Sequence, residues 1–217
     1  MIAGLLVAGA IIFVNVREQK AGALGGGENV PAAAADLSKA RPPSATDHVS
    51  GTVGAPIVMI EYSDFECPYC SMVYPTLKRI VAESNGQIAW IYRNMPLTTI
   101  HADAEPAAEA AECIADEAGN AGFWKFADDI FGNQSALSST RYAALAKAAG
   151  ADPAKFAACT ASHQFKDKIA TDSAEAQSLG AQGTPYILII NTKTKKSAIA
   201  PGALKYDDLL QLVKSVQ

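Results

Sequence analysis

The chain of 217 residues lacks the features of several common protein classes. Only 18% of its residues are charged, the formal net charge is −4, and no basic stripe or arm is visible, which argues against nucleic-acid binding. Neither a GxGxxG nor a P-loop pattern occurs, so no nucleotide or flavin cofactor is expected. No internal repeat is visible, which excludes a repeat architecture.

Cysteine and histidine are also scarce, with four and three residues respectively. None of His48, His101 and His163 is close in sequence to the cysteine motif. We expect them at exposed loop or helix positions, with no catalytic or metal-binding role. Cys67 and Cys70 stand three positions apart, but no second ligand pair at matching spacing supports a zinc site. An even number of cysteines suits an oxidising compartment.

The sequence Cys67-Pro68-Tyr69-Cys70 is the most informative feature. It follows an apolar run at 57–62 and opens a segment with apolar residues at helical spacing, which predicts a helix that begins near Cys67. Free N–H groups and the helix dipole favour a thiolate there, so Cys67 is the predicted nucleophile. Cys70, one turn later, can close the internal disulfide that releases a bound partner. Half of a zinc site or an inert structural disulfide would have the same spacing.

The first 50 residues differ from the rest in composition. Residues 1–16 are interpreted as a membrane anchor or signal segment, because about 15 consecutive residues carry no charge. We expect an uncleaved anchor with the remainder outside the membrane, and a buried core helix is the alternative. Residues 17–50 contain Gly25-Gly26-Gly27 and Pro42-Pro43 and little bulky apolar content, which predicts a flexible linker.

Residues 51–217 are expected to form one α/β domain. Apolar runs rich in Ile, Val and Tyr predict strands, and a long segment of good helix formers separates two of them from the other two. Within that segment, Phe123, Phe126 and Ile130 belong to a stripe that we assign to the core. The expected elements are strand, helix, strand, helical insertion, strand, strand and helix, at residues 57–62, 68–85, 87–94, about 98–180, 186–190, 197–200 and 204–216.

The CPYC sequence, the helical insertion and Gly183-Thr184-Pro185-Tyr186 together resemble the DsbA-type thioredoxin-fold proteins, particularly their membrane-tethered or exported bacterial branch. The resemblance covers about residues 53–217 and implies a thioredoxin fold with an inserted α-helical domain. It implies that Thr184-Pro185 is a cis-proline loop beside the cysteines, where a client peptide binds together with Pro68 and Tyr69. A trans proline at the start of a strand is the alternative.

The resemblance also implies roles for three further residues. Glu61 lies six residues before Cys67, where the superfamily has an acidic residue that exchanges protons with the second cysteine. A buried Glu61 should have a raised pKa, whereas an outward-facing glutamate on an edge strand should not. Cys113 and Cys159 match a structural disulfide of exported relatives, which would stabilise the fold by about 4 kcal/mol on the chain-entropy model. Two buried free thiols are the alternative.

The expected function is protein thiol-disulfide exchange, in the direction that oxidises exported proteins with free thiols. The resemblance implies a monomer at the periplasmic or extracytoplasmic face of a bacterial membrane, reoxidised by a quinone-linked membrane protein of the DsbB or VKOR type. Tyr69 stands where the best-known pattern has histidine, so the redox potential is left between about −120 and −230 mV. A reductase or isomerase of the same fold, a membrane-tethered copper metallochaperone and a non-catalytic interaction domain remain alternatives.

Overall fold

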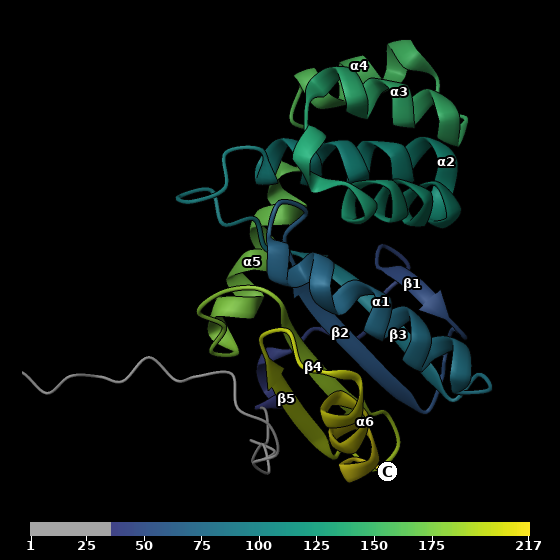
Figure 1. Cartoon of the computed structure of the whole chain (residues 1–217), viewed down its shortest axis with the longest axis vertical. Helices are drawn as coiled ribbons and strands as arrows, with labels where there is room; N and C mark the ends of the chain where they lie inside the picture. Colours follow the sequence, from purple (N-terminus) through teal and green to yellow (C-terminus); the bar gives the residue numbers. More distant parts are fainter. Residues whose placement is uncertain (1–35) are drawn as a thin grey trace, which may run out of the picture. The chain divides into compact units, whose positions relative to one another are not determined.

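The computed structural model describes residues 36–217, so the segment expected to be an anchor at 1–16 lies outside the described residues. The described part is an α/β fold built on a five-stranded sheet of order β1-β3-β2-β4-β5 (Figure 1). Its elements are η1 (Leu37–Lys39), β1 (His48–Gly51), β2 (Ile57–Ser63), α1 (Pro68–Glu83), β3 (Ile88–Asn94), α2 (Ala104–Gly132), η2 (Gln134–Ala136), α3 (Ser139–Ala149), α4 (Pro153–Ala161), α5 (Lys166–Ser178), β4 (Tyr186–Asn191), β5 (Ser197–Pro201) and α6 (Tyr206–Ser215).

The central strand β2 pairs in parallel with β3 and antiparallel with β4. All seven of its residues are buried, because its alternate side chains enter two cores on opposite faces of the sheet. Met59 packs in the core beneath α1 and α6, whereas Ile60 packs in the core that includes Ala176 of α5. Glu61 is the one acidic residue in this apolar strand, and it lies beneath the start of α1.

The helical insertion lies at one end of the sheet, where α2, α3 and α4 form a layer of their own (Figure 1). It begins with α2 and returns to the sheet through α5, close to the expected range of 98–180. The predicted core stripe is confirmed, because Phe123, Phe126 and Ile130 are all buried. Helix α2 is kinked at Gly119, whose φ of 69° is one that glycine adopts without steric cost. The expected α/β architecture with an inserted helical domain is therefore confirmed.

The linker expected at 17–50 extends too far toward the C-terminus. Strand β1 begins inside that range and pairs antiparallel with β3. The side chain of Arg41 bonds to Glu175 on α5 (Nε to Oε2, 3.0 Å), and Asp47 pairs with Arg93 on β3 (2.9 Å). Composition misled the prediction because ion pairs with buried partners, together with a few small apolar contacts such as Leu37 and Val49, hold this stretch to the sheet.

The described helices were compared with the length and apolar character of a membrane-spanning helix. Between residues 36 and 217, none of them combines the length and apolar character needed to cross a bilayer.

Candidate active site

Cys67 is the N-cap residue of α1, and Pro68 is the first residue of the helix. The carbonyl oxygen of Cys67 accepts hydrogen bonds from the N–H groups of Cys70 (3.1 Å) and Ser71 (3.2 Å). Both Cys67 and Cys70 are free thiols and are buried. The sulfur of Cys67 therefore lies at the positive end of the helix, as the sequence predicts.

The two thiols have pKa values that move in opposite directions. The pKa of Cys67 is lowered to about 6, chiefly because the Cys70 thiol donates a hydrogen bond to its sulfur. Burial opposes this change, while Thr184 and the N–H groups of Cys70 and Tyr69 add to it. Burial raises the pKa of Cys70 well above its usual value, and the hydrogen bond to Cys67 and the nearby Glu61 carboxylate act in the same direction. A thiolate at Cys67 and a thiol at Cys70 are the favoured pair near neutral pH.

Glu61 is fully buried in the central strand, on the face covered by α1. Its carboxylate accepts hydrogen bonds from Ser63 Oγ (2.9 Å) and Trp90 Nε1 (3.1 Å), which are neutral donors. Burial raises the pKa of Glu61 to about 8, and these two hydrogen bonds offset only part of the effect. The alternative of an outward-facing glutamate on an edge strand is wrong. Near neutral pH, Glu61 can hold or release a proton beside Cys70.

The loop before β4 approaches Cys67 from the other side. The Thr184–Pro185 peptide bond is cis, and the Cys67 thiol donates to the carbonyl oxygen of Thr184, with 3.4 Å between Sγ and the oxygen. A hollow of about 300 Å³ opens beside this loop, lined by Gln182, Gly183, Thr184, Pro185, Tyr186, Pro201, Gly202 and Gly180. Backbone groups next to the sulfur of Cys67 are thus available to an extended segment of another chain.

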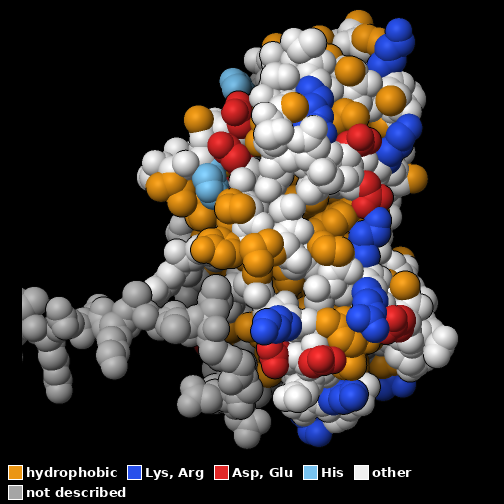
Figure 2. All heavy atoms as spheres, in the orientation of Figure 1, with side chains coloured by type: hydrophobic (Ala, Val, Ile, Leu, Met, Phe, Trp, Pro, Cys, Tyr) orange, Lys and Arg blue, Asp and Glu red, His pale blue; other side chains and the backbone are white. Residues whose placement is uncertain are grey.

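Large apolar side chains are exposed around the start of α1. Tyr69 is 59% exposed and Met72 is 65% exposed, and Ile100 on the loop between β3 and α2 is 72% exposed. Figure 2 shows hydrophobic side chains gathered on this face, over the region where α1 begins in Figure 1. An exposed apolar surface beside a reactive sulfur is suited to contact another protein.

Two contacts from the insertion support the cysteine loop, and sequence reasoning missed both. Gln134 in η2 donates hydrogen bonds from Nε2 to the carbonyl oxygens of Phe65 and Cys67, each at 2.9 Å. The hydroxyl of Ser71 donates to the carbonyl of Phe131 at 3.0 Å. Gln134 lies 67 positions after Cys67 and stands in no recognisable motif, so no local signal could have identified it.

The histidines differ from the expectation of exposed positions. His48 is only 5% exposed within β1, which corrects its assignment to an exposed loop. His101 is mostly buried and bonds through Nδ1 to Asp64, three residues before Cys67, at 2.8 Å. Only the side chain of His163, 64% exposed, is as predicted. Distance in sequence misled the prediction because the loop between β3 and α2 folds back onto the start of α1.

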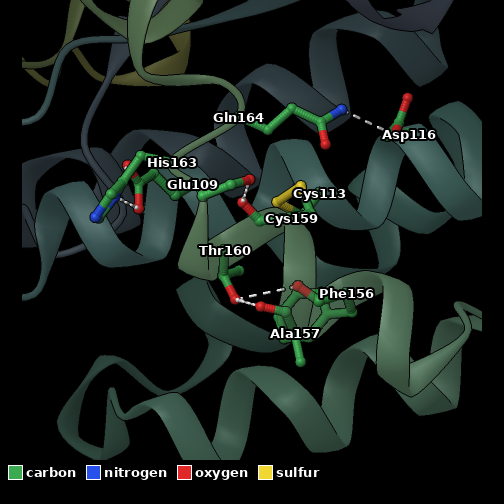
Figure 3. The surroundings of a disulfide bond; sticks show 10 residues. Glu109, Cys113, Asp116, Phe156, Ala157, Cys159, Thr160, His163 and Gln164 are labelled. Carbon is green, nitrogen blue, oxygen red and sulfur yellow. Dashed lines mark hydrogen bonds and ion pairs between the residues drawn. A yellow bond between two sulfur atoms is a disulfide. The ribbon is translucent and has the colours of Figure 1, made fainter.

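The other two cysteines are joined in a disulfide within the insertion (Figure 3). Cys113 on α2 and Cys159 on α4 have Cα atoms 5.9 Å apart and are separated by 46 positions in sequence. Figure 3 shows this bond among His163, Glu109 and Gln164, on side chains of the insertion alone. It links two helices covalently and takes no part in the geometry around Cys67.

Similarity to known proteins agrees with this arrangement. The family model described as thioredoxin matches residues 43–214. Among solved structures, DsbA2 of Pseudomonas aeruginosa superposes with a TM-score of 0.68 and 24% identity, covering 82% of this chain and 97% of that chain. BdbD of Bacillus subtilis, in its oxidised form, superposes with a TM-score of 0.68 and 20% identity, covering 85% of this chain and 96% of that one. These likenesses show the fold.

A curated relative is the Na⁺/H⁺ antiporter NhaA 3 of Salinispora tropica, which is 32% identical over 143 residues, or 66% of this chain. The chain spans about a fifth of the length of that relative, since the match covers 21% of it. With the family model matching most of the chain, the chain belongs to the thioredoxin family, and its fold is that of the DsbA-type thiol-disulfide oxidoreductases.

Proposed function

We propose that this chain is a protein-disulfide oxidoreductase that forms disulfides in exported proteins through Cys67 and Cys70. The observation that carries the proposal is the opposed ionisation of the two thiols, with the pKa of Cys67 lowered to about 6 and that of Cys70 raised. A cysteine that is stable as a thiolate is a good leaving group from a mixed disulfide, which favours transfer of the disulfide to a client.

The proposed cycle begins with the disulfide between Cys67 and Cys70. A client thiolate attacks the sulfur of Cys67, the internal disulfide breaks, and Cys70 leaves and takes up a proton. A second client thiolate then attacks the client sulfur of the mixed disulfide and releases Cys67 as a thiolate. Two electrons pass from the client to the CxxC pair, and the client gains one disulfide.

Glu61 is proposed to move the proton of Cys70. It is buried on the same face of the sheet, and its pKa of about 8 lets it exchange a proton near neutral pH. Because Cys70 is fully buried, its proton needs an internal carrier. The neutral donors Ser63 and Trp90 hold the carboxylate without fixing it in the ionised state.

The client is proposed to bind across Thr184-Pro185 and the exposed Pro68-Tyr69. The carbonyl of Thr184 is 3.4 Å from Cys67 Sγ, so a client segment paired with this loop would have its cysteine beside the nucleophile. The exposed Tyr69 offers an apolar contact that does not depend on one client sequence.

The location and the partner of the enzyme are proposed from the resemblance to exported DsbA-type proteins. We place it at the periplasmic or extracytoplasmic face of a bacterial membrane, as a monomer held by residues 1–16. One structural neighbour is a periplasmic thioredoxin-like protein of Salmonella enterica, which supports this location. A quinone-linked membrane protein of the DsbB or VKOR type would restore the disulfide. We propose no ion transport, since the antiporter match covers 21% of that relative.

The equilibrium constant of the full chain with glutathione tests the direction. We expect a potential between about −120 and −230 mV, and a value near −270 mV, typical of thioredoxin, would overturn the oxidising assignment. A Cys67→Ser variant should lose both client oxidation and insulin reduction. His163→Ala is the suitable control, because His101 is bonded to the cysteine loop.

A Cys70→Ser variant tests the client class. It should accumulate mixed disulfides at Cys67, because the internal thiol that releases a bound partner is missing. Trapped in the native cell envelope, these adducts should contain exported proteins. Adducts made only with cytoplasmic proteins would contradict the proposed location.

A further inference from the structure

Asp64 connects the cysteine motif to a loop that is distant in sequence. Its N–H group donates to Cys70 Sγ at 3.5 Å, and its carbonyl oxygen accepts from the N–H of Cys67 at 3.1 Å. Its carboxylate is fully buried and accepts hydrogen bonds from the backbone N–H groups of Glu66 (2.7 Å) and Leu97 (2.8 Å). One residue therefore contacts the backbone of Cys67, the sulfur of Cys70 and the loop that follows β3.

The third partner of the Asp64 carboxylate is the side chain of His101. His101 bonds through Nδ1 to Asp64 Oδ2 at 2.8 Å, and its side chain is only 15% exposed. Burial alone lowers the pKa of His101, but the hydrogen bond and the negative charge of Asp64, followed by the charges of Cys67 and Glu66, raise it overall. The imidazolium is thus favoured next to the cysteine loop.

The charges at this end of α1 show why the cation matters. A buried carboxylate beside Cys67 opposes a thiolate there through like-charge repulsion, and Glu61 acts in the same sense from below. Tyr69, between the two cysteines, has no positive charge and points to solvent. His101 is close enough to feel the charge of Cys67, so its proton balances the carboxylate where the motif itself supplies no cation.

We infer that His101 is a positioning residue for Cys67, which holds Asp64 and the loop after β3 in place and balances the Asp64 charge so that the thiolate of Cys67 is favoured. The inference rests on the proposed thiol-disulfide activity. It assigns to His101 the positive charge near Cys67 that no residue of the CPYC motif supplies. His101 acts through Asp64 and the local field, without contact to the reacting sulfur.

The test is the pH dependence of Cys67 alkylation by iodoacetamide, measured on the reduced full chain. His101→Gln should raise the midpoint of Cys67 ionisation by about half a unit or more, which lowers the alkylation rate about threefold below the midpoint. In the double variant Asp64→Asn/His101→Gln, the midpoint should return toward the wild-type value because the unbalanced carboxylate is gone. A purely structural role predicts that the double variant is no better than the single one.

His163→Gln is the matched control. His163 also bonds to a carboxylate, Glu109, at 2.7 Å, but this pair belongs to the insertion beside the disulfide (Figure 3). The variant should leave the midpoint of Cys67 unchanged. Equal shifts in both histidine variants would overturn the inference.

A measurement on the unmodified protein covers the case in which the variants do not fold. The NMR titration of His101 should give a lower midpoint in the oxidised protein than in the reduced one, because the Cys67 thiolate is lost, while His163 should not change. An unchanged His101 would overturn the inference alone. Ionisation of wild-type Cys67 near 8.5, as in a free peptide, would overturn the proposed function as well.

Discussion

Glu61 and Glu112 are both buried carboxylates, yet their pKa values move in opposite directions. Glu61, beneath the cysteine motif, has neutral hydrogen-bond donors only, and burial raises its pKa to about 8. Glu112, on α2, is 2% exposed, and burial alone would also raise its pKa. Hydrogen bonds and charges from His48 (3.0 Å) and Lys168 (2.6 Å) outweigh burial and lower it.

The difference shows that the partners of a buried carboxylate, rather than its burial, decide whether it keeps its proton. Glu112 belongs to a region of ion pairs that includes Arg93 with Asp47 and Glu175. Such a region favours charged side chains, and its ion pairs hold residues 41–47, the sheet and α5 together. Around Glu61 the same fold provides hydrogen bonds without a cation, so the carboxylate can exchange a proton.

Of the variants that test this comparison, removal of the Glu112 carboxylate should change the free energy of unfolding most. Glu112→Ala leaves the buried His48 without its counter-charge and the side-chain amide of Asn94 without its acceptor, and Lys168 keeps only its longer contact with Asp172 (3.4 Å). We expect the free energy of unfolding to fall by about 3 to 5 kcal/mol in urea titrations. Glu117→Ala, on the same helix, removes an ion pair with the exposed Lys155 and should cost less than about 1 kcal/mol. Equal losses would contradict the contrast between the two sites.

Glu61→Gln should stabilise the reduced protein near neutral pH. A carboxyl whose pKa is raised on folding loses stability as pH rises from 4.5 to about 8, because the unfolded chain releases the proton first. The neutral amide removes this penalty, which is on the order of 3 kcal/mol at pH 7. Urea unfolding at pH 4 should show little difference from the wild type. A gain that does not depend on pH would contradict the assigned ionisation.

The pH dependence of Glu112 should have the opposite sign. Its lowered pKa in the folded state contributes stability that is present above 4.5 and is lost as pH falls through the folded value. The stability advantage of the wild type over Glu112→Gln should therefore shrink in acid. The change should amount to about 1.4 kcal/mol for each unit by which the pKa is lowered. An advantage that grows below pH 4.5 would show that Glu112 is neutral in the folded protein.

Ser63→Ala should have the smallest effect. The Ser63 hydroxyl donates to the Glu61 carboxylate and lowers its pKa, so its removal should raise the midpoint of Glu61 above 8 by up to about one unit. Carbon NMR of the labelled carboxyl group measures this midpoint directly. Ser178→Ala on α5, which removes a hydroxyl bonded to the Glu175 carbonyl, should leave it unchanged. A downward shift would mean that another group controls Glu61.

Several elements could be predicted because their signals are local. The apolar run at 57–62 predicted a strand, and helical spacing after Pro68 placed Cys67 at a helix start. The stripe around Phe126 marked the core side of the insertion. Composition failed at the end of the linker, where ion pairs with Arg93 hold residues that look disordered by their apolar content.

The sequence by itself determined which groups the proposed chemistry can use: two thiols one helical turn apart, the first of them at a helix start, and a carboxylate in the strand before it. The tertiary structure decided how these groups ionise. It left Glu61 without a cation, brought Gln134 and His101 to the cysteine loop, and buried His48 against Glu112. Electrostatic interactions depend on distance in space and on burial, and neither can be read from positions along the chain.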